Sequence, residues 1–313
     1  MFEAELRRSS LREAGSSWSP VDPDAFHRAM AHFNRRRLAV AVPGETWQHD
    51  LDDERAMREL EGYWIEAGRA EVADAVAAAP SDVEGFLAWF EALEATGPGQ
   101  HDPLFDWLAD VATLDEMRWF LAQEVAGEAG FDDLVAMTQV KLSPPQAKME
   151  LARNYWDEMG RGNLKGMHGP MLGVLVADLA LDAAIETTVW ESLALANTMA
   201  AFATTRRYAW HSVGALGAIE LTAPGRSAKT AAGLRRLGLS DRQRRYFDLH
   251  AVLDVKHSED WNREVLRPLV AAHPEAARFI AEGALMRLNC GERCFARYRQ
   301  MLWSDRGRIA AAA

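Results

Sequence analysis

The sequence predicts an all-α protein, and three features of its pattern support this fold class. Long segments carry apolar residues at helical spacing, and stretches containing Gly and Pro separate them. The chain has neither an internal repeat nor the strand–helix alternation of an α/β protein. Only one short run, LAVAVPGETW (38–47), has some strand character, and Pro43-Gly44 ends it. We therefore predict a helical bundle.

Size and charge narrow the functional classes. The chain has 313 residues, of which 49% are apolar and 26% charged, and its net charge is -11. A chain this acidic is not expected to bind nucleic acid, because phosphate binding needs a basic surface. No window approaches 18 uninterrupted apolar residues, and the N-terminus lacks the apolar core of a secretory signal. We expect a soluble cytoplasmic protein that binds neither nucleic acid nor membranes.

The two cysteines agree with that location. Cys290 and Cys294 lie four residues apart, on one face of a predicted helix. We interpret them as two free thiols in a reducing compartment, with a redox pair as the alternative.

Gly, Pro and capping residues set the expected helix boundaries. The tract TGPGQHDP (96–103) divides the chain into an N-terminal helical extension (1–95) and the main bundle (96–313). We expect a loop, with at most a short helix, at 223–240. The expected helices are 22–37, 53–79, 81–95, 103–111, 114–129, 145–159, 171–183, 185–204, 208–221, 246–261 and 274–303.

The helix Tyr246–Trp261 carries the strongest functional signal. On an α-helix Asp254 lies about 40° from His250, and His257 lies about 20° to the other side. Two imidazoles and a carboxylate thus share one narrow face, and this combination suits iron when further carboxylates join. The same spacing also arises by chance, so the interpretation depends on carboxylates elsewhere in the bundle.

Three other segments supply such carboxylates. Glu124 lies at helical spacing from a cluster of bulky apolar residues, with Glu128 as the alternative one turn later. Glu158 and His168 are ten residues apart, and an unbroken helix would turn them about 280° from each other. The glycines at 160, 162 and 166 permit a change of direction that brings them together. Glu220 ends an otherwise apolar turn and needs a partner if it is buried.

Together these side chains outnumber the ligands of one ion. Four carboxylates and three imidazoles suit two irons, although the paired Glu-x-x-His motifs of ferritin-like proteins are absent. The predicted metal ligands and catalytic residues are Glu124, Glu158, His168, Glu220, His250, Asp254 and His257.

The order and spacing of these residues resemble the haem-oxygenase-like diiron oxidases and oxygenases, also called iron-containing redox enzymes. The resemblance covers about residues 100–265, through the segments FLAQEVAGEAGFDDLVAMTQ, NYWDEMGRGNLKGMH, GAIE and HAVLDVKH. It implies a haem-oxygenase-like bundle that binds two Fe(II)/Fe(III) ions and no haem. It places Glu124, Glu158, His168 and His257 around one iron. Glu220, His250 and Asp254 surround the other.

The resemblance also implies a function. We expect O2 to be a co-substrate, and the substrate to be a small amino-acid- or carboxylic-acid-derived metabolite of a biosynthetic pathway. The expected reaction is N-oxygenation or oxidative C–C cleavage, in a homodimer supplied by an external electron donor. Arg206, Arg207 and Tyr208 are candidates for holding a substrate carboxylate. The alternatives are a metal-free thiaminase-like or cofactorless oxidase bundle, haem binding through one histidine, and a non-catalytic helical interaction module.

Overall fold

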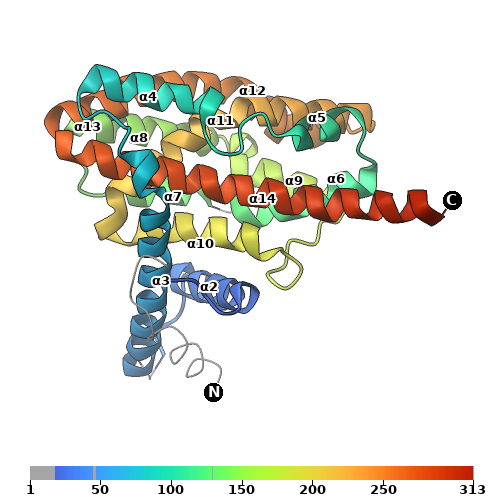
Figure 1. Ribbon diagram of the computed structural model, residues 1–313, viewed down its shortest axis with the longest axis horizontal. Coiled ribbons are helices and arrows are strands. Elements are labelled where there is room, and N and C mark those ends of the chain that lie inside the picture. Colours follow the sequence, from blue (N-terminus) through green and yellow to red (C-terminus); the bar gives the residue numbers. More distant parts are fainter. Residues whose placement is uncertain (1–17, 45–46, 129, 313) are drawn as a thin grey trace.

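The computed structural model describes residues 18–44, 47–128 and 130–312, and the regular structure within these ranges is entirely helical (Figure 1). Side chains are described for all of these except residues 49, 127, 128 and 304–312. The all-α prediction is confirmed. The helices in chain order are α2 (Pro23–Leu38), α3 (Trp47–Val76), α4 (Val83–Thr96), α5 (Pro103–Asp110), α6 (Leu114–Glu128), α7 (Phe131–Thr138), α8 (Pro145–Glu158), α9 (His168–Leu179), α10 (Trp190–Thr204), α11 (Ala209–Arg236), α12 (Asp241–Asp260), α13 (Arg267–Ala272) and α14 (Ala277–Ala312).

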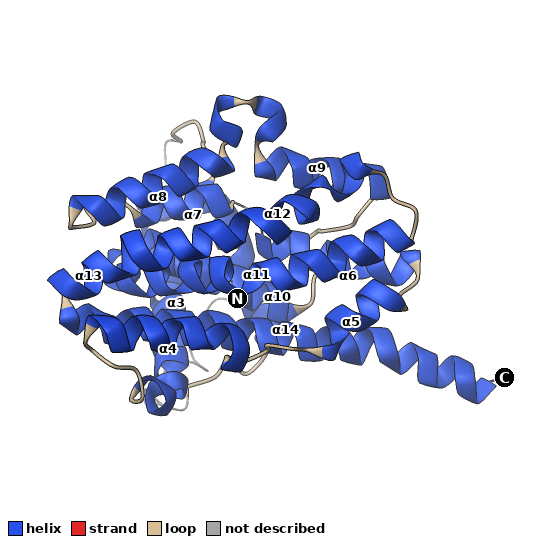
Figure 2. Cartoon of the chain, turned by 90° about the horizontal axis from the view of Figure 1, so that it is seen from above, coloured by secondary structure: helices blue, strands red, loops and turns tan. Residues whose placement is uncertain are grey.

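Helix α11 is the centre of the bundle. It packs along α12 on one side and α14 on another, and it also contacts α5. Figure 2 shows α8, α9 and α12 gathered along one side of the molecule. Figure 1 shows α3 running across the direction of α10 and α14, with α2 beside it. Three of the helices that carry predicted ligands therefore lie on the same side of the bundle.

The apolar side chains form two large clusters and one small one. The small cluster joins α2 to the first half of α3, through Phe26, Met30 and Leu60. The second half of α3 and all of α4 belong to a large cluster instead, where Ile65 and Phe86 are fully buried. The N-terminal segment thus packs into the main core, and its division from the bundle at residues 95–96 stays a prediction.

Two glycines let α11 and α14 approach closely. A Cβ atom at Gly214 would lie 1.8 Å from the carbonyl oxygen of Ile280, and one at Gly283 would lie 2.0 Å from that of His211. A larger residue at either position would therefore push the helices apart.

Two local predictions are wrong. The run 38–47 forms no strand within its described residues, because α2 extends to Leu38 and α3 begins at Trp47. The expected loop at 223–240 is largely helix, since α11 continues to Arg236 with Pro224 inside it. Proline lacks the N–H that would bond to the carbonyl of Glu220, four residues earlier, yet packing on α12 and α14 carries the helix past it. Helix α7 was not predicted as an element.

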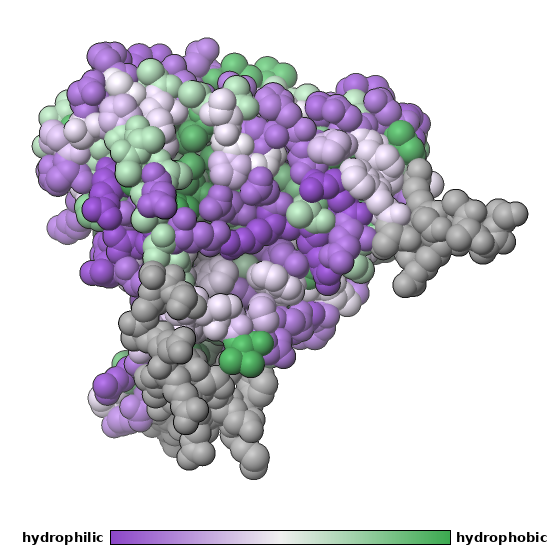
Figure 3. Space-filling view, in the orientation of Figure 1, coloured by the Kyte–Doolittle hydropathy of each residue, from purple (hydrophilic) through white to green (hydrophobic). Residues whose placement is uncertain are grey.

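One face of the molecule is mainly polar. Figure 3 shows a largely hydrophilic face with small, scattered hydrophobic patches. Among the described residues, no helix is both long enough and apolar enough to span a bilayer. Cys290 and Cys294 are buried free thiols within α14.

Candidate metal centre

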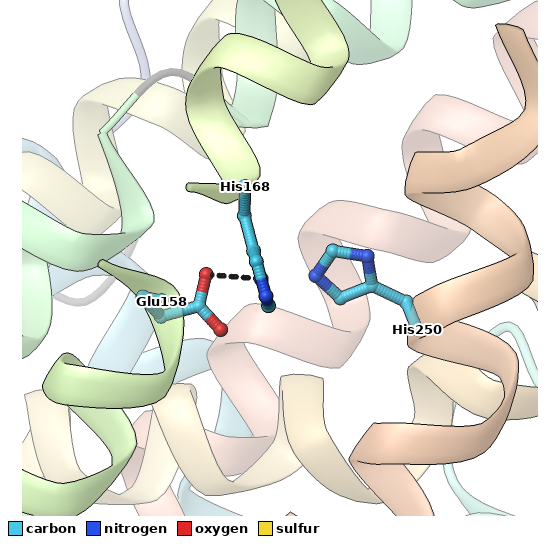
Figure 4. Close-up of side chains that lie close together, drawn as sticks. All are labelled: Glu158, His168 and His250. Atoms are coloured by element: carbon cyan, nitrogen blue, oxygen red, sulfur yellow. Dashed lines mark ion pairs between the residues drawn. The ribbon is translucent and has the colours of Figure 1, made fainter. Parts of the chain in front are cut away.

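The first group of candidate ligands lies where α8, α9 and α12 meet. One ligand atom each from Glu158, His168 and His250 lies within 4.8 Å of the other two. His168 Nδ1 is 2.7 Å from Glu158 Oε2, and the two imidazole rings meet edge to face with centroids 4.6 Å apart. Figure 4 shows the carboxylate and both rings turned toward one common space. Glu158 and His168 are buried, and His250 is half-buried.

A tight turn between α8 and α9 brings Glu158 and His168 together. Gly160 adopts φ +62°, and a Cβ atom there would lie 2.3 Å from the backbone carbon of Gly166. Only glycine allows the two chain segments of this turn to approach so closely. The chain reverses within residues 159–167, and His168 opens α9 beside the end of α8. The expectation that the glycines change the chain direction is confirmed.

The second group comes from α11 and α12. Glu220, Asp254 and His257 are each buried, and one ligand atom from each lies within 4.8 Å of the others. His257 Nδ1 lies 3.4 Å from Glu220 Oε2 and 3.8 Å from Asp254 Oδ1. These three side chains meet because α11 and α12 pack along each other over most of their length.

Neighbouring groups orient the imidazoles. His250 Nδ1 lies 2.7 Å from the carbonyl oxygen of Tyr246 and must donate to it, so Nε2 carries the lone pair that could bind a metal. His257 Nε2 lies 3.2 Å from Asp157 Oδ2, so a proton on Nε2 leaves Nδ1 facing Glu220. Such outer hydrogen bonds commonly fix the ring orientation of histidine ligands. Asn154 Nδ2 donates to Glu220 Oε1 at 2.6 Å in the same way.

The carboxylates of this centre change the pKa of His257. Burial disfavours the imidazolium, yet Glu220 and Asp157, helped by Glu158, raise the pKa of His257 to about 9. Burial likewise opposes ionisation of Asp157, but its pKa is lowered by Arg161 and His257. Without a metal, a proton on His257 therefore balances part of the carboxylate charge at neutral pH.

These residues fit a pair of divalent ions. Among the described residues, Glu158 and Glu220 form no ion pair with arginine or lysine, and each lies beside an imidazole instead. His168 Nδ1 and His257 Nδ1 are buried and form no hydrogen bond of good geometry in the described chain. Ligand nitrogens close to carboxylate oxygens, without hydrogen bonds, are what a bound cation would require.

Both groups open into one cavity. Glu158 and His250 of the first group line it together with Glu220 and Asp254 of the second. Its volume is about 90 Å³, enough for a small molecule beside the ligands. The rest of its wall is mainly apolar, with Phe105, Phe120, Phe131, Leu172, Leu195, Ile219, Phe247 and Phe295.

Glu124 lines this cavity but belongs to neither group of three. Its Oε1 accepts a hydrogen bond of 2.9 Å from the Tyr298 hydroxyl. The alternative at this position, Glu128, ends α6, and its side chain lies outside the described residues. The structure thus brings together six of the seven predicted ligands, and the identity of the seventh stays a prediction.

The structure corrects the predicted grouping of the two histidines on α12. His250 lies with Glu158 and His168, and His257 lies with Glu220, the reverse of the expected assignment. Seven residues span about 10 Å along a helix, so these histidines reach different depths of the bundle although they share a face. The first part of α12 faces α9, which carries His168.

The residues proposed to hold a substrate carboxylate have structural roles instead. Arg206 donates to the carbonyl oxygens of Met137 and Val140, where α7 ends. Arg207 and Tyr208 both donate to Glu66 on α3. None of the three lines the cavity described above.

The fold and site define a helical protein with two adjacent histidine–carboxylate groups suited to metal. Residues 118–292 match the family model described as iron-containing redox enzyme. This match spans more than half of the chain, so the protein belongs to the iron-containing redox enzyme family. The predicted family is confirmed, and with it the haem-oxygenase-like bundle and an oxidoreductase that uses iron. A comparison with curated proteins finds no match.

Proposed function

We propose that this protein is a non-haem diiron enzyme that uses O2 to oxidise a small amino-acid- or carboxylic-acid-derived metabolite. The reaction would be N-oxygenation or oxidative C–C cleavage within a biosynthetic pathway. The proposal retains a cytoplasmic homodimer and an external electron donor. The observation that carries it is the single cavity onto which both ligand groups open.

The chain's own residues would divide the work as follows. Glu158, His168 and His250 would hold one iron, and Glu220, Asp254 and His257 would hold the other. Bound iron supplies a site where O2 is reduced and made reactive. The carbonyl of Tyr246 would keep His250 Nε2 directed at its ion, and the apolar wall of the cavity would exclude bulk water from the reacting substrate.

The proposal is tested by loading metal-free protein with Fe(II) under anaerobic conditions. We expect two irons per chain, and O2 consumption on exposure to air. The variant His168→Ala should bind about one iron, whereas His32→Ala, which changes an exposed histidine of α2, should still bind two. Stoichiometry near zero in the unmodified protein would instead favour the metal-free bundle.

The seventh ligand is tested by a matched pair of variants. We propose Glu124 for this role, with Glu128 as the alternative one turn along α6. Glu124→Gln and Glu128→Gln remove one negative charge each. In an Fe(II) titration, the ligand is the residue whose variant no longer binds two irons per chain. If Glu124→Gln keeps both irons and Glu128→Gln does not, Glu128 replaces Glu124 in the proposed set.

A further inference from the structure

One buried arginine in the cavity has no hydrogen-bond or ion-pair partner among the described residues. Arg287 on α14 is 7% exposed and lines the same cavity as the ligand groups. Its guanidinium forms no hydrogen bond or ion pair with any described residue, and its Nε atom is fully enclosed. The contrast with Arg244 is direct, because that arginine is equally buried but donates to the Leu239 carbonyl and to Asp241.

The fold makes room for this guanidinium. Gly291, one turn later on α14, also lines the cavity, and a Cβ atom there would lie 3.1 Å from Arg287 Nη1. Cys294 continues the same helix face toward Phe295. This wall of α14 therefore presents one cation among small and apolar groups.

An unpaired buried guanidinium is costly, since burial removes its water without replacing the hydrogen bonds. The cavity's other arginine, Arg226, is engaged: its Nη2 donates to Thr222 Oγ1 at 2.8 Å, and its guanidinium lies over the Phe295 ring. No carboxylate of the described chain therefore pairs with Arg287. A ligand in the cavity can provide one.

We propose that Arg287 binds the carboxylate of the substrate, and that the substrate is a small, apolar monocarboxylic acid. This inference rests on the proposed function, whose cavity it uses. A guanidinium pairs with a carboxylate through two parallel hydrogen bonds. A single negative charge matches one arginine, whereas a dianion would meet excess negative charge from Glu124, Glu158 and Glu220 in the same cavity.

The position of Arg287 also orients the substrate. Arg287 lies on α14, whereas the ligand groups come from α8, α9, α11 and α12. The carboxylate would be held on the α14 wall, and the apolar body would lie among Phe105, Phe120 and Phe295. The end of the substrate opposite the carboxylate would then reach the ligand groups. The cavity volume of about 90 Å³ keeps that body small.

The test measures binding of hexanoate and hexan-1-ol to metal-free protein by ligand-observed NMR. Hexanoate should bind the unmodified protein at least about tenfold more tightly than hexan-1-ol. Arg287→Met should weaken the binding of hexanoate by about 10–100-fold and leave the affinity for hexan-1-ol unchanged. Arg287→Lys should weaken the binding of hexanoate less than Arg287→Met does. Arg235→Met, which changes an exposed arginine outside the cavity, serves as the control and should bind like the unmodified protein.

The outcomes separate this inference from the proposed function. Equal affinity for hexanoate and hexan-1-ol in the unmodified protein would overturn the carboxylate site, even if Arg287→Met fails to fold. Equal affinity of hexanoate for the unmodified protein and a folded Arg287→Met would do the same. Iron loading is measured in parallel and should be unchanged in Arg287→Met. Failure of iron loading alone would overturn the proposed function and leave the acid site in place.

Discussion

Two of the buried histidine–glutamate pairs in this bundle have their charges balanced in different ways. In the first, His211 Nε2 lies 2.9 Å from Glu282 Oε2, and Arg69 Nε donates to the same oxygen at 2.6 Å. In the second, His257 faces Glu220, and no arginine or lysine among the described residues pairs with that carboxylate. The first pair joins α3, α11 and α14, and the second belongs to the candidate metal centre.

The pKa values of the two histidines move in opposite directions. Burial lowers the pKa of His211, and its hydrogen bond to Glu282 offsets only part of this effect. Burial also acts on Glu282, but hydrogen bonds from His211 and Arg69 lower its pKa to about 2. The pKa of His257 is raised to about 9. An arginine thus completes the first pair, whereas the second still requires a proton or a metal ion.

The largest expected effect comes from removing the arginine. Arg69→Met should lower the free energy of unfolding by about 3–5 kcal/mol, because Glu282 stays buried with less positive charge. The pKa of His211 should then rise above 6.5, as that of His257 does. Denaturant unfolding and NMR titration measure the two effects. Arg278→Met removes a more exposed partner of the same carboxylate and should cost less than about 1 kcal/mol. A pKa of His211 that stays low in Arg69→Met would contradict this account.

The second-largest expected effect comes from neutralising the glutamate of each pair in turn. Glu220→Gln should weaken the second iron by at least about a hundredfold, because a ligand of that ion is lost. Glu282→Gln should lower stability and leave two irons per chain. Anaerobic Fe(II) titration combined with thermal unfolding separates metal binding from stability. Loss of iron from both variants, or from neither, would show that the two pairs do not differ as described.

A smaller effect appears in the pH dependence of metal-free protein. Since the pKa of His257 is raised, folding gains from its proton below pH 6.5, and this gain disappears as pH rises toward 9. Since the pKa of His211 is lowered, its contribution changes the other way: stability falls as pH drops below 6.5. Relative to the unmodified protein, His257→Gln should flatten the profile above pH 6.5 by on the order of 1–3 kcal/mol, and His211→Gln should flatten it below pH 6.5. Unfolding curves between pH 5 and 10 measure the free energy of unfolding against pH. If either assignment is wrong, the slope in that variant will equal the slope in the unmodified protein.

The smallest effect concerns the hydrogen bond behind His257. Asp157→Asn should weaken the second iron by about 10–100-fold, since Asp157 orients the ring without being a ligand. Asp248→Asn, on the outward side of α12, should have no effect on iron binding. A competition assay with a chelator measures both affinities. Equal affinities for Asp157→Asn and the unmodified protein would assign Asp157 to the ion pair with Arg161 alone.

Sequence periodicity predicted the parts of the site that lie within one helix. The face shared by His250, Asp254 and His257 follows from helical geometry alone. Periodicity gives the direction of a side chain but not its depth along the axis. The assignment of each histidine to its partners was therefore wrong, because it depends on where α9 and α11 cross α12.

Other residues carry signals that sequence alone misreads. Pro224 indicates a helix end, but packing on two neighbours keeps α11 intact. Asp157 precedes Arg161 by four residues and has the pattern of an ordinary surface pair. Arg287 lies in an apolar stretch, where a long side chain usually extends to solvent. In this fold it is enclosed, and only the three-dimensional arrangement reveals it.

Helix α12 supplies ligands to both groups: His250 to the first, and Asp254 and His257 to the second. Any ion that fixes this helix through one group also limits the motion of the ligands in the other. Part of the entropy cost of the second binding event is then met by the first. In the proposed diiron centre the two occupancies would be thermodynamically linked, and by reciprocity each ion would change the affinity for the other by the same factor. If the entropy gain exceeds the repulsion between the two ions, the proposed centre would fill over a narrow range of free metal.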